Sequence, residues 1–444
     1  MLAMSKTGSR RGMGAALMAL MMLVGLAVPA SAPAGEAGWT VQFGTPANDR
    51  ATGVAARGRS VYVAGVTAGS LPGQVSAGAA DVFVARFNSR GELRWIRQFC
   101  TPGADTTTNG SLQVRDGLVV VGGDTAGTLP EQTSAGGRDA FVRAYDRHGE
   151  VRWTVQFGSV ADDQVRGVAI ARDGSIFVVG DTNGQLPNQT SAGGLDAFVM
   201  RLDPDGTVRW LRQFGTPGAD TAIGVAVTKG ALYVAGATDR AFPGEANLGG
   251  FDTFLARLTL DGDFEWITQF GTTGTDAAWK VGVADSTVFV AGHTLGVFPG
   301  ETALGQSDGF VAAFRRDGQL KWVRQFGTTG CDQMFGLAVD DEGAVVAGDV
   351  GGTTMPNQAL CQVNPDGSAR KYDDDGNVVW TIQLGTPVVD RVNAVALKGD
   401  DVYLVGTTAG DLGGPNAGLN DAFVTRIPAP TRPDDDGAGD EDDD

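Results

Sequence analysis

The 444-residue chain has little histidine, little cysteine and no window with the sustained 3.6-residue periodicity of a helix. Its two histidines, His148 and His293, fall in different units of an internal repeat, so they cannot form one metal site. No Gly-rich phosphate loop opens a helix, and serine, histidine and aspartate do not gather at matching loop positions for nucleophilic catalysis. These absences predict a protein that is not an enzyme and that uses no cofactor and no metal.

Basic residues are also in deficit. Lys and Arg number 34 against 52 Asp and Glu, which gives a formal net charge of -18. Such a charge argues against nucleic acid and against anionic membrane surfaces as partners.

Tryptophan, by contrast, recurs at an almost constant interval of 56 to 58 residues. The series is Trp39, Trp95, Trp153, Trp210, Trp266, Trp322 and Trp380, and Trp279 stands outside it. Each unit holds four short runs rich in Val, aromatic and β-branched residues, bounded by Gly, Asp or Pro. This pattern predicts four antiparallel strands per unit, called A to D, with tight turns between A and B and between C and D.

Four-stranded repeats arranged radially form a β-propeller. The repeat region starts on a D strand, residues 39–43, and stops after a C strand, residues 421–427. Pairing these two ends would complete a seventh blade and remove two exposed sheet edges. The sequence therefore predicts an all-β, seven-bladed propeller over residues 35–427, closed by its own termini. The expected blades span about 49–99, 105–157, 163–214, 220–270, 276–326, 332–384, and 390–427 with 39–43.

The repeated phrases Trp-x-x-Gln-Phe-Gly-Thr, Val-Tyr-Val-Ala-Gly-x-Thr and Asp-Ala-Phe-Val-Ala-Arg-Phe resemble the bacterial SBBP repeat, whose name abbreviates seven-bladed β-propeller. The resemblance covers about residues 39–427. It implies the fold and an exported bacterial protein, and it carries over no catalytic residues. Cys100 and Leu384 depart from the Gln-Phe-Gly phrase, and Asp366-Gly-Ser-Ala-Arg-Lys-Tyr372 departs most, which predicts a weakened strand in blade six.

Both ends of the chain differ from the repeats. Residues 1–34 are typical of a signal peptide, with basic residues, an apolar stretch over 12–28 and a cleavage site after Ala34. The alternative is a retained membrane anchor. Residues 428–444 are rich in Pro and then acidic, which predicts a disordered, solubilising tail. A calcium-collecting segment is the alternative for the tail.

Three cysteines are present. Cys331 lies in a D–A connection and Cys361 in the next B–C loop, and these two connections emerge on the same face of a blade. A disulfide between Cys331 and Cys361 is therefore predicted for blade six. Cys100 is expected to be a free thiol.

Two carboxylate series recur in every repeat. One precedes strand A and comprises Asp49, Asp105, Asp163, Asp220, Asp276, Asp332 and Asp390. The other opens strand C and comprises Asp81, Asp139, Asp196, Asp252, Asp308, Asp366 and Asp421. Short Asp side chains accept hydrogen bonds from nearby backbone N–H groups, which favours a structural role in turns. A ring of calcium sites is the alternative.

Function is expected where the repeats disagree. The residue three positions after the first Asp of each repeat varies, and so does the residue between Gly and Thr at the end of strand B. Both positions should lie near the mouth of the central channel, on the face with the long loops. The candidate ligand-binding residues at or beside these positions are Arg166, Ile223, Trp279, Lys280, Phe335 and His293. The alternative is that these side chains only pack between blades.

The main hypothesis is therefore an exported, monomeric binding scaffold for a protein or peptide, at the cell envelope or outside the cell, with no transmembrane segment after signal cleavage. An aromatic arc formed by Ile223, Trp279 and Phe335 would also suit a sugar, so a lectin-like propeller is the second hypothesis. The third is an enzyme with its site at the channel mouth, as other propellers have.

Overall fold

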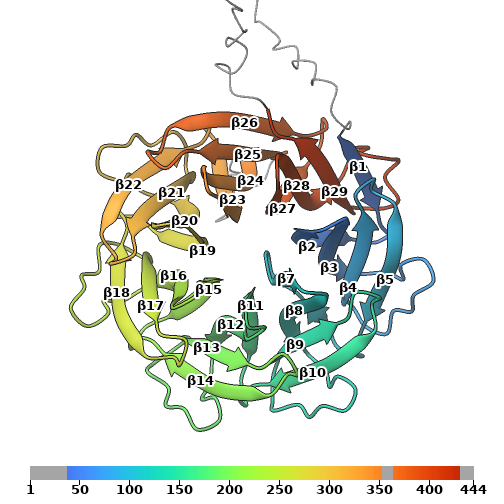
Figure 1. Ribbon diagram of the computed structural model, residues 1–444, viewed down its shortest axis with the longest axis horizontal. Coiled ribbons are helices and arrows are strands. Elements are labelled where there is room, and N and C mark those ends of the chain that lie inside the picture. Colours follow the sequence, from blue (N-terminus) through green and yellow to red (C-terminus); the bar gives the residue numbers. More distant parts are fainter. Residues whose placement is uncertain (1–37, 353–363, 431–444) are drawn as a thin grey trace, which may run out of the picture. The chain divides into compact units, whose positions relative to one another are not determined.

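The computed structural model describes residues 38–352 and 364–430, which form strands, turns and bends. Seven antiparallel sheets are arranged around a central axis, in chain order, as the blades of a propeller (Figure 1). The predicted all-β, seven-bladed fold is confirmed. Within the described residues no helix is long and apolar enough to cross a bilayer.

The strands of each blade run from A, nearest the axis, to D at the rim. Blade one contains β2 (Asp49–Arg57), β3 (Ser60–Thr67), β4 (Asp81–Asn88) and β5 (Leu93–Phe99). Blade two contains β6 (Asp105–Thr106), β7 (Leu112–Arg115), β8 (Leu118–Thr125), β9 (Asp139–Tyr145) and β10 (Val151–Phe157). Blade three contains β11 (Asp163–Ile170), β12 (Ile176–Thr182), β13 (Asp196–Leu202) and β14 (Val208–Phe214).

The remaining blades repeat this order. Blade four contains β15 (Asp220–Val227), β16 (Leu232–Thr238), β17 (Asp252–Leu258) and β18 (Phe264–Phe270). Blade five contains β19 (Asp276–Ala284), β20 (Thr287–Thr294), β21 (Asp308–Arg315) and β22 (Leu320–Phe326). Blade six contains β23 (Cys331–Asp340), β24 (Gly343–Gly352), β25 (Asp366–Tyr372) and β26 (Val378–Leu384).

Blade seven is shared by the two ends of the described chain. It contains β27 (Asp390–Lys398), β28 (Asp401–Thr408), β29 (Asp421–Pro428) and, as its D strand, β1 (Trp39–Phe43). Strand β1 pairs antiparallel with β29 from Trp39 opposite Arg426 to Phe43 opposite Ala422. The predicted closure is confirmed: β29 is paired on both sides, by β28 and β1, and β1 takes the rim position that the D strand has in the other blades.

The recurring Trp joins neighbouring blades. Trp95 of blade one donates a hydrogen bond from Nε1 to the carbonyl oxygen of Arg147, in the C–D turn of blade two. The Gly149 of that turn has a φ of +84°, and a Cβ there would lie 2.9 Å from the Trp95 ring. The same bond to the next blade's C–D turn is made by Trp39, Trp153, Trp210 and Trp322. The Trp period is therefore the period of the contact between blades.

The recurring Gln ties strand D to the rest of its own blade. Gln213 donates from Nε2 to Asp196 Oδ2 over 2.7 Å and to the carbonyl oxygen of Gly184 over 2.8 Å. Its Oε1 accepts the backbone N–H of Leu186 over 2.9 Å. One side chain thus holds strand C and the long B–C loop at once. In every blade the corresponding Gln donates to the Asp that opens strand C.

The divergent strand of blade six is regular. Strand β25 pairs with both β24 and β26, so the expectation of a weakened strand is not met in its hydrogen bonding. Lys371 is buried there and forms ion pairs with Asp340 and Glu342 over 3.0 and 2.5 Å. Lys371 stands where most repeats have Arg, and these pairs compensate its buried charge.

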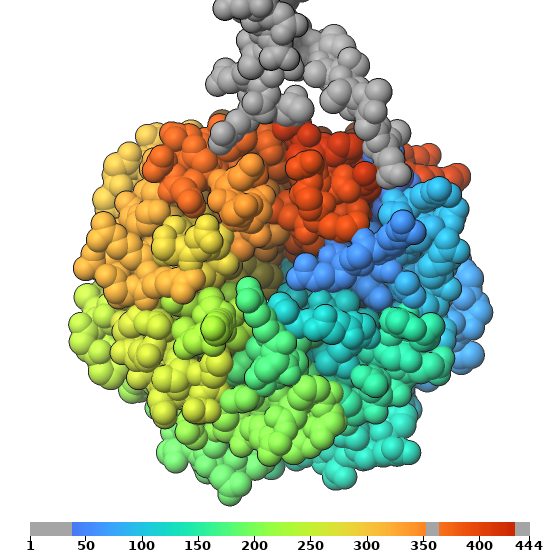
Figure 2. Space-filling model, in the orientation of Figure 1, coloured from blue at the N-terminus to red at the C-terminus, as the bar shows by residue number. Residues whose placement is uncertain are grey.

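Two faces follow from the strand directions. The face that carries the B–C loops and D–A connections is called the long-loop face, and the face that carries the A–B and C–D turns is called the turn face. The gap at the centre of the ribbon view is largely filled by side chains in the space-filling view (Figures 1 and 2).

Candidate functional site at the channel mouth

The variable residue three positions after the strand-A Asp lies in a β-bulge. In blade five the register of β19 against β20 shifts between Ala278 and Lys280, so Trp279 is left unpaired. The same shift leaves Thr52, Arg166, Ile223, Phe335 and Asn393 unpaired in their blades. An unpaired residue is free to turn its side chain away from the regular alternation of the strand. Bulges thus place the residues that differ between repeats at the innermost strands.

The structure brings three of the candidate residues together. The rings of Trp279 and Phe335, from blades five and six, meet edge to face with centroids 5.1 Å apart. Trp279 also donates from Nε1 to His293 Nδ1 over 2.8 Å. Trp279 and His293 remain half-buried, whereas Phe335 is buried. These three residues form an aromatic cluster with two partly accessible members.

His293 is held in its neutral form. Burial lowers its pKa to about 4, because the charged imidazolium loses its hydration there. Its Nδ1 accepts the Trp279 proton, so the ring proton of the neutral imidazole is on Nε2. Since Nδ1 is already engaged by Trp279, it is not free to take up a proton from a nucleophile.

Lys280 crosses the channel. Its Nζ donates over 2.6 Å to the carbonyl oxygen of Asn109, which belongs to blade two. Burial lowers the pKa of Lys280 to about 7, and the positive charge of Arg166 acts in the same direction. Lys280 stands where the other repeats mostly have Gly, so this bridge is particular to blade five.

The partner segment of Lys280 is a break in the inner strand of blade two. Residues 107–111 separate β6 from β7, and Figure 1 shows β7 reaching toward the middle of the ring. Gly110 N–H donates to the carbonyl oxygen of Thr52 in blade one over 2.7 Å. Thr108 Oγ1 donates to the carbonyl oxygen of Arg166 in blade three over 3.0 Å. This segment therefore links four blades. It was not predicted from the sequence, although Asn109-Gly110 is a turn signal inside a strand.

Carboxylates at the ends of the B strands tie the channel mouth together. Asp181 accepts hydrogen bonds from Arg166 Nε of its own blade and from Thr221 Oγ1 of blade four, each over 2.6 Å. Asp349 accepts the N–H of Val392 over 3.2 Å and pairs with Arg391 of blade seven over 3.3 Å. Burial raises the pKa of Asp349 to about 7. Asp181 and Asp349 therefore link neighbouring blades at the channel mouth.

The remaining candidate residues differ from the cluster in their exposure and partners. Ile223 is buried, whereas Trp279 is half-buried. Arg166 is engaged by Asp181 rather than by the aromatic cluster. The candidate site is thus the cluster of Trp279, His293 and Phe335, flanked by Lys280, and its chemistry is that of an aromatic surface beside a buried amine.

Both Asp series make hydrogen bonds within the fold. Asp220, from the first series, accepts the backbone N–H and the hydroxyl of Thr216 over 2.6 and 2.9 Å. The same pattern binds the first Asp of each repeat to the Thr or Ser four residues earlier. Within residues 38–352 and 364–430, no group of three or more His, Cys, Asp or Glu is placed to hold a metal ion.

Two of the three cysteines lie within the described residues. Cys100 is a free, half-buried thiol, as expected. Burial raises its pKa, and the nearby Asp81 acts in the same direction. Cys331 is buried. Cys361 lies outside the described residues, so its disulfide with Cys331 stays a prediction, as do the signal peptide over 1–34 and most of the tail over 428–444.

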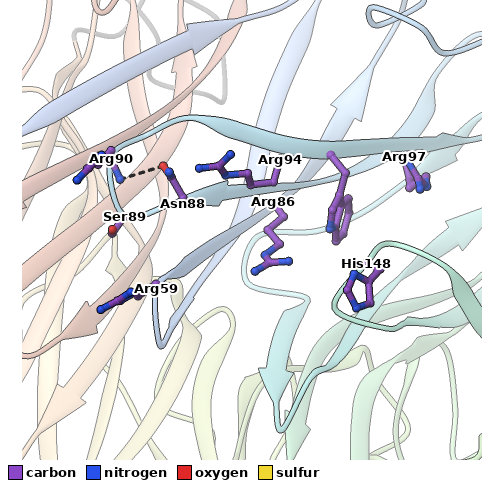
Figure 3. Close-up of a pocket in the computed structure, with 9 residues that line it drawn as sticks. Arg59, Arg86, Asn88, Ser89, Arg90, Arg94, Arg97 and His148 are labelled. Atoms are coloured by element: carbon purple, nitrogen blue, oxygen red, sulfur yellow. Dashed lines mark hydrogen bonds between the residues drawn. The ribbon is translucent and has the colours of Figure 1, made fainter.

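A second concave surface lies on the turn face of blades one and two, and sequence reasoning missed it. A hollow of about 920 Å³ is lined by Arg59, Arg86, Arg90, Arg94, Trp95 and Arg97, with His148 at its edge (Figure 3). An adjoining hollow of about 930 Å³ shares Arg86 and His148 and adds four further arginines. The signal was present in the turns, where Arg90 and His148 stand at the position that is Asp in blades three to six.

Fold and site together define a seven-bladed β-propeller with a bridged central channel. Residues 152–187 match the family model described as a β-propeller repeat, SBBP. The predicted resemblance to this repeat is confirmed.

A curated relative and two solved structures are similar to this chain. The regulatory protein FlaEY of Caulobacter vibrioides is 26% identical, over 89% of this chain and 44% of that protein. The chain therefore spans less than half the length of this relative. A puromycin-hydrolysing peptidase of Mycobacterium tuberculosis has a TM-score of 0.51 at 13% identity, over 87% of this chain and 53% of that chain. The WD40 propeller domain of Doa1 has a TM-score of 0.49 at 10% identity, over 87% and 96% of the two chains. The likeness to the peptidase shows the fold alone, which binding proteins and enzymes share.

Proposed function

We propose that this propeller is a non-catalytic binding scaffold that holds a protein or peptide at the channel mouth of its long-loop face. One observation carries the proposal: the residues that differ between otherwise similar blades are placed by bulges at the innermost strands. Trp279 presents a partly accessible aromatic surface there, next to Lys280 in the chain. Aromatic side chains beside a positioned polar group are typical anchors for a bound peptide.

The state of the polar groups supports binding rather than catalysis. His293 is neutral with Nδ1 engaged, and Lys280 is bonded to a backbone carbonyl. Asp181 is occupied by Arg166 and Thr221, and Asp349 by Arg391. The relative from Caulobacter vibrioides is named a regulatory protein, which is in keeping with a role in binding.

Substitution of Trp279 tests the proposal. Full-length wild-type protein, a Trp279→Ala variant and a Val160→Ser variant are each immobilised and exposed to extracts of the source organism. Val160 is 86% exposed in the D–A connection on the same face, away from the channel. We expect a partner that is retained by wild type and by Val160→Ser and lost by Trp279→Ala, with thermal unfolding confirming that all three proteins are folded. Equal retention by all three would remove the channel mouth from the proposal.

A glycan is the second candidate ligand, because the face of Trp279 could stack on a sugar ring. The full-length protein is applied to a broad glycan array with and without calcium. Saturable binding that Trp279→Ala abolishes would favour the lectin-like function over the peptide scaffold. Loss of that binding on calcium removal would assign the Asp series a role in metal binding. A blank array in both conditions leaves the peptide scaffold as the better supported function.

The place of action that we propose is the cell envelope or the outside of the cell. The support is the sequence of residues 1–34, with its basic start, apolar stretch and Ala34 cleavage site. Cell fractionation and the intact mass of the recovered protein test this step. Recovery outside the cytoplasm with residue 35 at the N-terminus is expected. A cytoplasmic protein that keeps residues 1–34 would overturn it.

A further inference from the structure

The arginine groove consists of the two adjoining hollows on the turn face of blades one and two. Five arginines line each hollow and Arg86 lines both, so nine of the 34 basic residues of the chain surround this groove. Figure 3 shows that the side chains of Arg59, Arg86 and Arg94 come from different strands and turns of blade one, with His148 of blade two beside them. The chain as a whole has a net charge of -18, so the groove is a positively charged region of an otherwise acidic protein.

Much of this charge is not neutralised within the described residues. Arg59 and Arg90 are exposed, and no ion pair of the described chain involves them. Arg86 donates to Ser60 Oγ over 3.0 Å and to the carbonyl oxygen of Arg147 over 2.8 Å, which orients its guanidinium without cancelling its charge. Within the described residues, Arg94 and Arg97 are the two of the nine arginines with carboxylate partners, Glu92 and Glu150, and Asp116 and Asp146 also line the second hollow. Oriented, unpaired guanidinium groups are suited to bind carboxylates.

The repeats disagree at this face. The C–D turn contains Arg90 in blade one and Arg147-His148 in blade two. In blade three the turn contains Asp203 and Asp205, and in blade six it contains Asp373-Asp374-Asp375. Blade five also has arginines in this turn, Arg315 and Arg316. The residue before the turn Gly, however, is Asp in blades three to six and is Arg90 or His148 in blades one and two. The charge therefore points to a ligand.

The chain itself carries an acidic segment that starts close to this groove. Strand β29 ends on the turn face, where Pro428 pairs with Asp401. Its Arg426 lies opposite Trp39, and Trp39 Nε1 donates to the carbonyl oxygen of Ser89 at the edge of the first hollow over 2.9 Å. The described chain stops at residue 430. The following fourteen residues, 431–444, include eight acidic ones between Asp434 and Asp444. An extended segment of that length spans about 45 Å, which is ample for reaching a neighbouring blade.

We propose that the arginine groove binds an acidic peptide, and that residues 434–444 of this same chain are its occupant. Charge complementarity supplies the attraction, since carboxylates would meet the unpaired Arg59 and Arg90 and the oriented Arg86. The covalent connection raises the effective concentration of the segment near the groove. An acidic partner protein would then have to compete with the chain's own segment, which makes the segment an autoinhibitor of this face.

The test compares wild type with three full-length variants. In the tail variant all eight acidic residues of 434–444 are replaced by Asn or Gln. In the groove variant Arg59, Arg90 and Arg94 are replaced by Ser, and in the control variant Arg172 and Arg212 of blade three are replaced by Ser. A fluorescent peptide with the sequence of residues 431–444 is titrated into each protein and into wild type at 0.15 M salt.

We expect the tail variant to bind the peptide about tenfold or more tightly than wild type, because the competing segment is gone. The control variant should match wild type. Combining the groove and tail substitutions should abolish binding, and binding to the tail variant should vanish at 1 M salt, where charge interactions are screened within about 3 Å.

Hydrogen–deuterium exchange supplies a second readout that needs no added peptide. Residues 88–94 and 146–152 should exchange faster in the tail variant than in wild type, because the segment no longer covers them. Equal peptide affinity of wild type and tail variant, together with unchanged exchange, would overturn the proposal. A sulfated polysaccharide that binds wild type and tail variant equally well would assign the groove to an outside polyanion and also overturn it.

Discussion

Lys280 in blade five is hydrogen-bonded to the carbonyl oxygen of Asn109 in blade two, 2.6 Å away across the central channel. The bridge joins two blades that share no direct interface. It also restricts passage through the ring, because the segment around Asn109 is bonded to blades one and three as well. The propeller is therefore a braced ring, and the channel mouth is a fixed surface.

Substitution of Lys280 should change the pH dependence of stability. The ordinary Lys pKa of 10.5 applies in the unfolded chain, and burial lowers it to about 7 in the fold. Between these values the unfolded chain binds a proton that the folded chain does not, so wild type gains stability as pH rises from 7 toward 10. We expect Lys280→Met to gain less over this range, by about 2 kcal/mol after allowing for the partial exposure of the side chain.

Chemical denaturation at pH 7 and pH 9.5 measures this difference. Lys229→Met is the control, because Lys229 is exposed in the A–B turn of blade four. An equal pH response of wild type and Lys280→Met would show that Lys280 keeps an ordinary pKa in the fold.

The lowered pKa of His293 predicts a loss of folding stability in acid. Its pKa is lowered from 6.5 to about 4, so the neutral form belongs to the fold and the charged form to the unfolded chain. Wild type should therefore lose stability as pH falls from 6.5 to 4, by about 2–3 kcal/mol from this group. In His293→Gln the amide oxygen can still accept from Trp279, and this loss should disappear.

Thermal unfolding at pH 7 and pH 4 provides the measurement. His148→Gln, at the other and exposed histidine, should behave as wild type. A His293→Gln variant that loses as much stability in acid as wild type would contradict the assigned neutral form.

Much of the fold could be predicted because the physical signal repeats. A single unit shows short strands weakly, but seven units in register show where each strand and turn must lie. The two ends of the repeat region also predicted closure. The strand at residue 39 is a D strand without a blade, and the strand at residue 421 is the C strand of a blade that has no D strand of its own. The bulge positions that contain Trp279 and Phe335 could also be located from sequence. They differ from blade to blade, whereas the residues around them repeat.

The features that were not predicted depend on contacts between residues of different blades. Asn109 contacts Lys280 only because blades two and five face each other over a narrow channel. The arginine groove assembles from turns of two blades, so Arg90 and Arg147 look like scattered surface charges along the chain. Sequence spacing also could not show that Ile223 is buried while Trp279 is half-buried, because it does not show how each bulge directs its side chain.

The Gln at the end of strand D should matter far more than its neighbours on the same strand. Gln213→Leu removes donors to Asp196 and Gly184 and an acceptor for Leu186, and it leaves a buried carboxylate with fewer partners. The expected loss of stability is about 2–4 kcal/mol. The adjacent, exposed Arg212→Leu should cost less than about 0.5 kcal/mol. Chemical denaturation of both variants checks the contrast, and similar losses would show that the Gln network is not the main link.

Thiol titration tests the cysteines. In denaturant without reductant, one thiol should react if Cys331 and Cys361 are bonded, and three should react after reduction. Reaction of three thiols without reductant would contradict the disulfide. In the folded protein Cys100 should react more slowly than in denaturant, because burial raises its pKa and leaves less of the reactive thiolate. A Cys100→Ser variant should lose this signal.

The last prediction concerns two carboxylates that face each other between neighbouring blades. Asp196 and Asp220 are buried, and the Oδ1 of each has no hydrogen-bond partner in the described part of the chain. Burial raises the pKa of Asp220, and the negative charge of Asp196 raises it further. A raised pKa contributes stability in acid that is lost as pH rises through the folded value. Asp196→Asn removes the repulsion while its oxygen can still accept from Gln213, so we expect a gain of about 1 kcal/mol at pH 7 and none at pH 4.

Thermal unfolding of Asp196→Asn at both pH values, with and without calcium, separates the two roles of the Asp series. Asp205→Asn, in an exposed turn, is the control. If Asp196→Asn is more stable at pH 7 and calcium does not alter the difference, the facing carboxylates have a structural role and their mutual repulsion lowers the stability of the fold. If calcium instead stabilises wild type and this effect is lost in Asp196→Asn, the unpartnered Oδ1 atoms are ligands of a cation. The expected gain would then become a loss, because the substitution would remove one of the two charges that hold the ion.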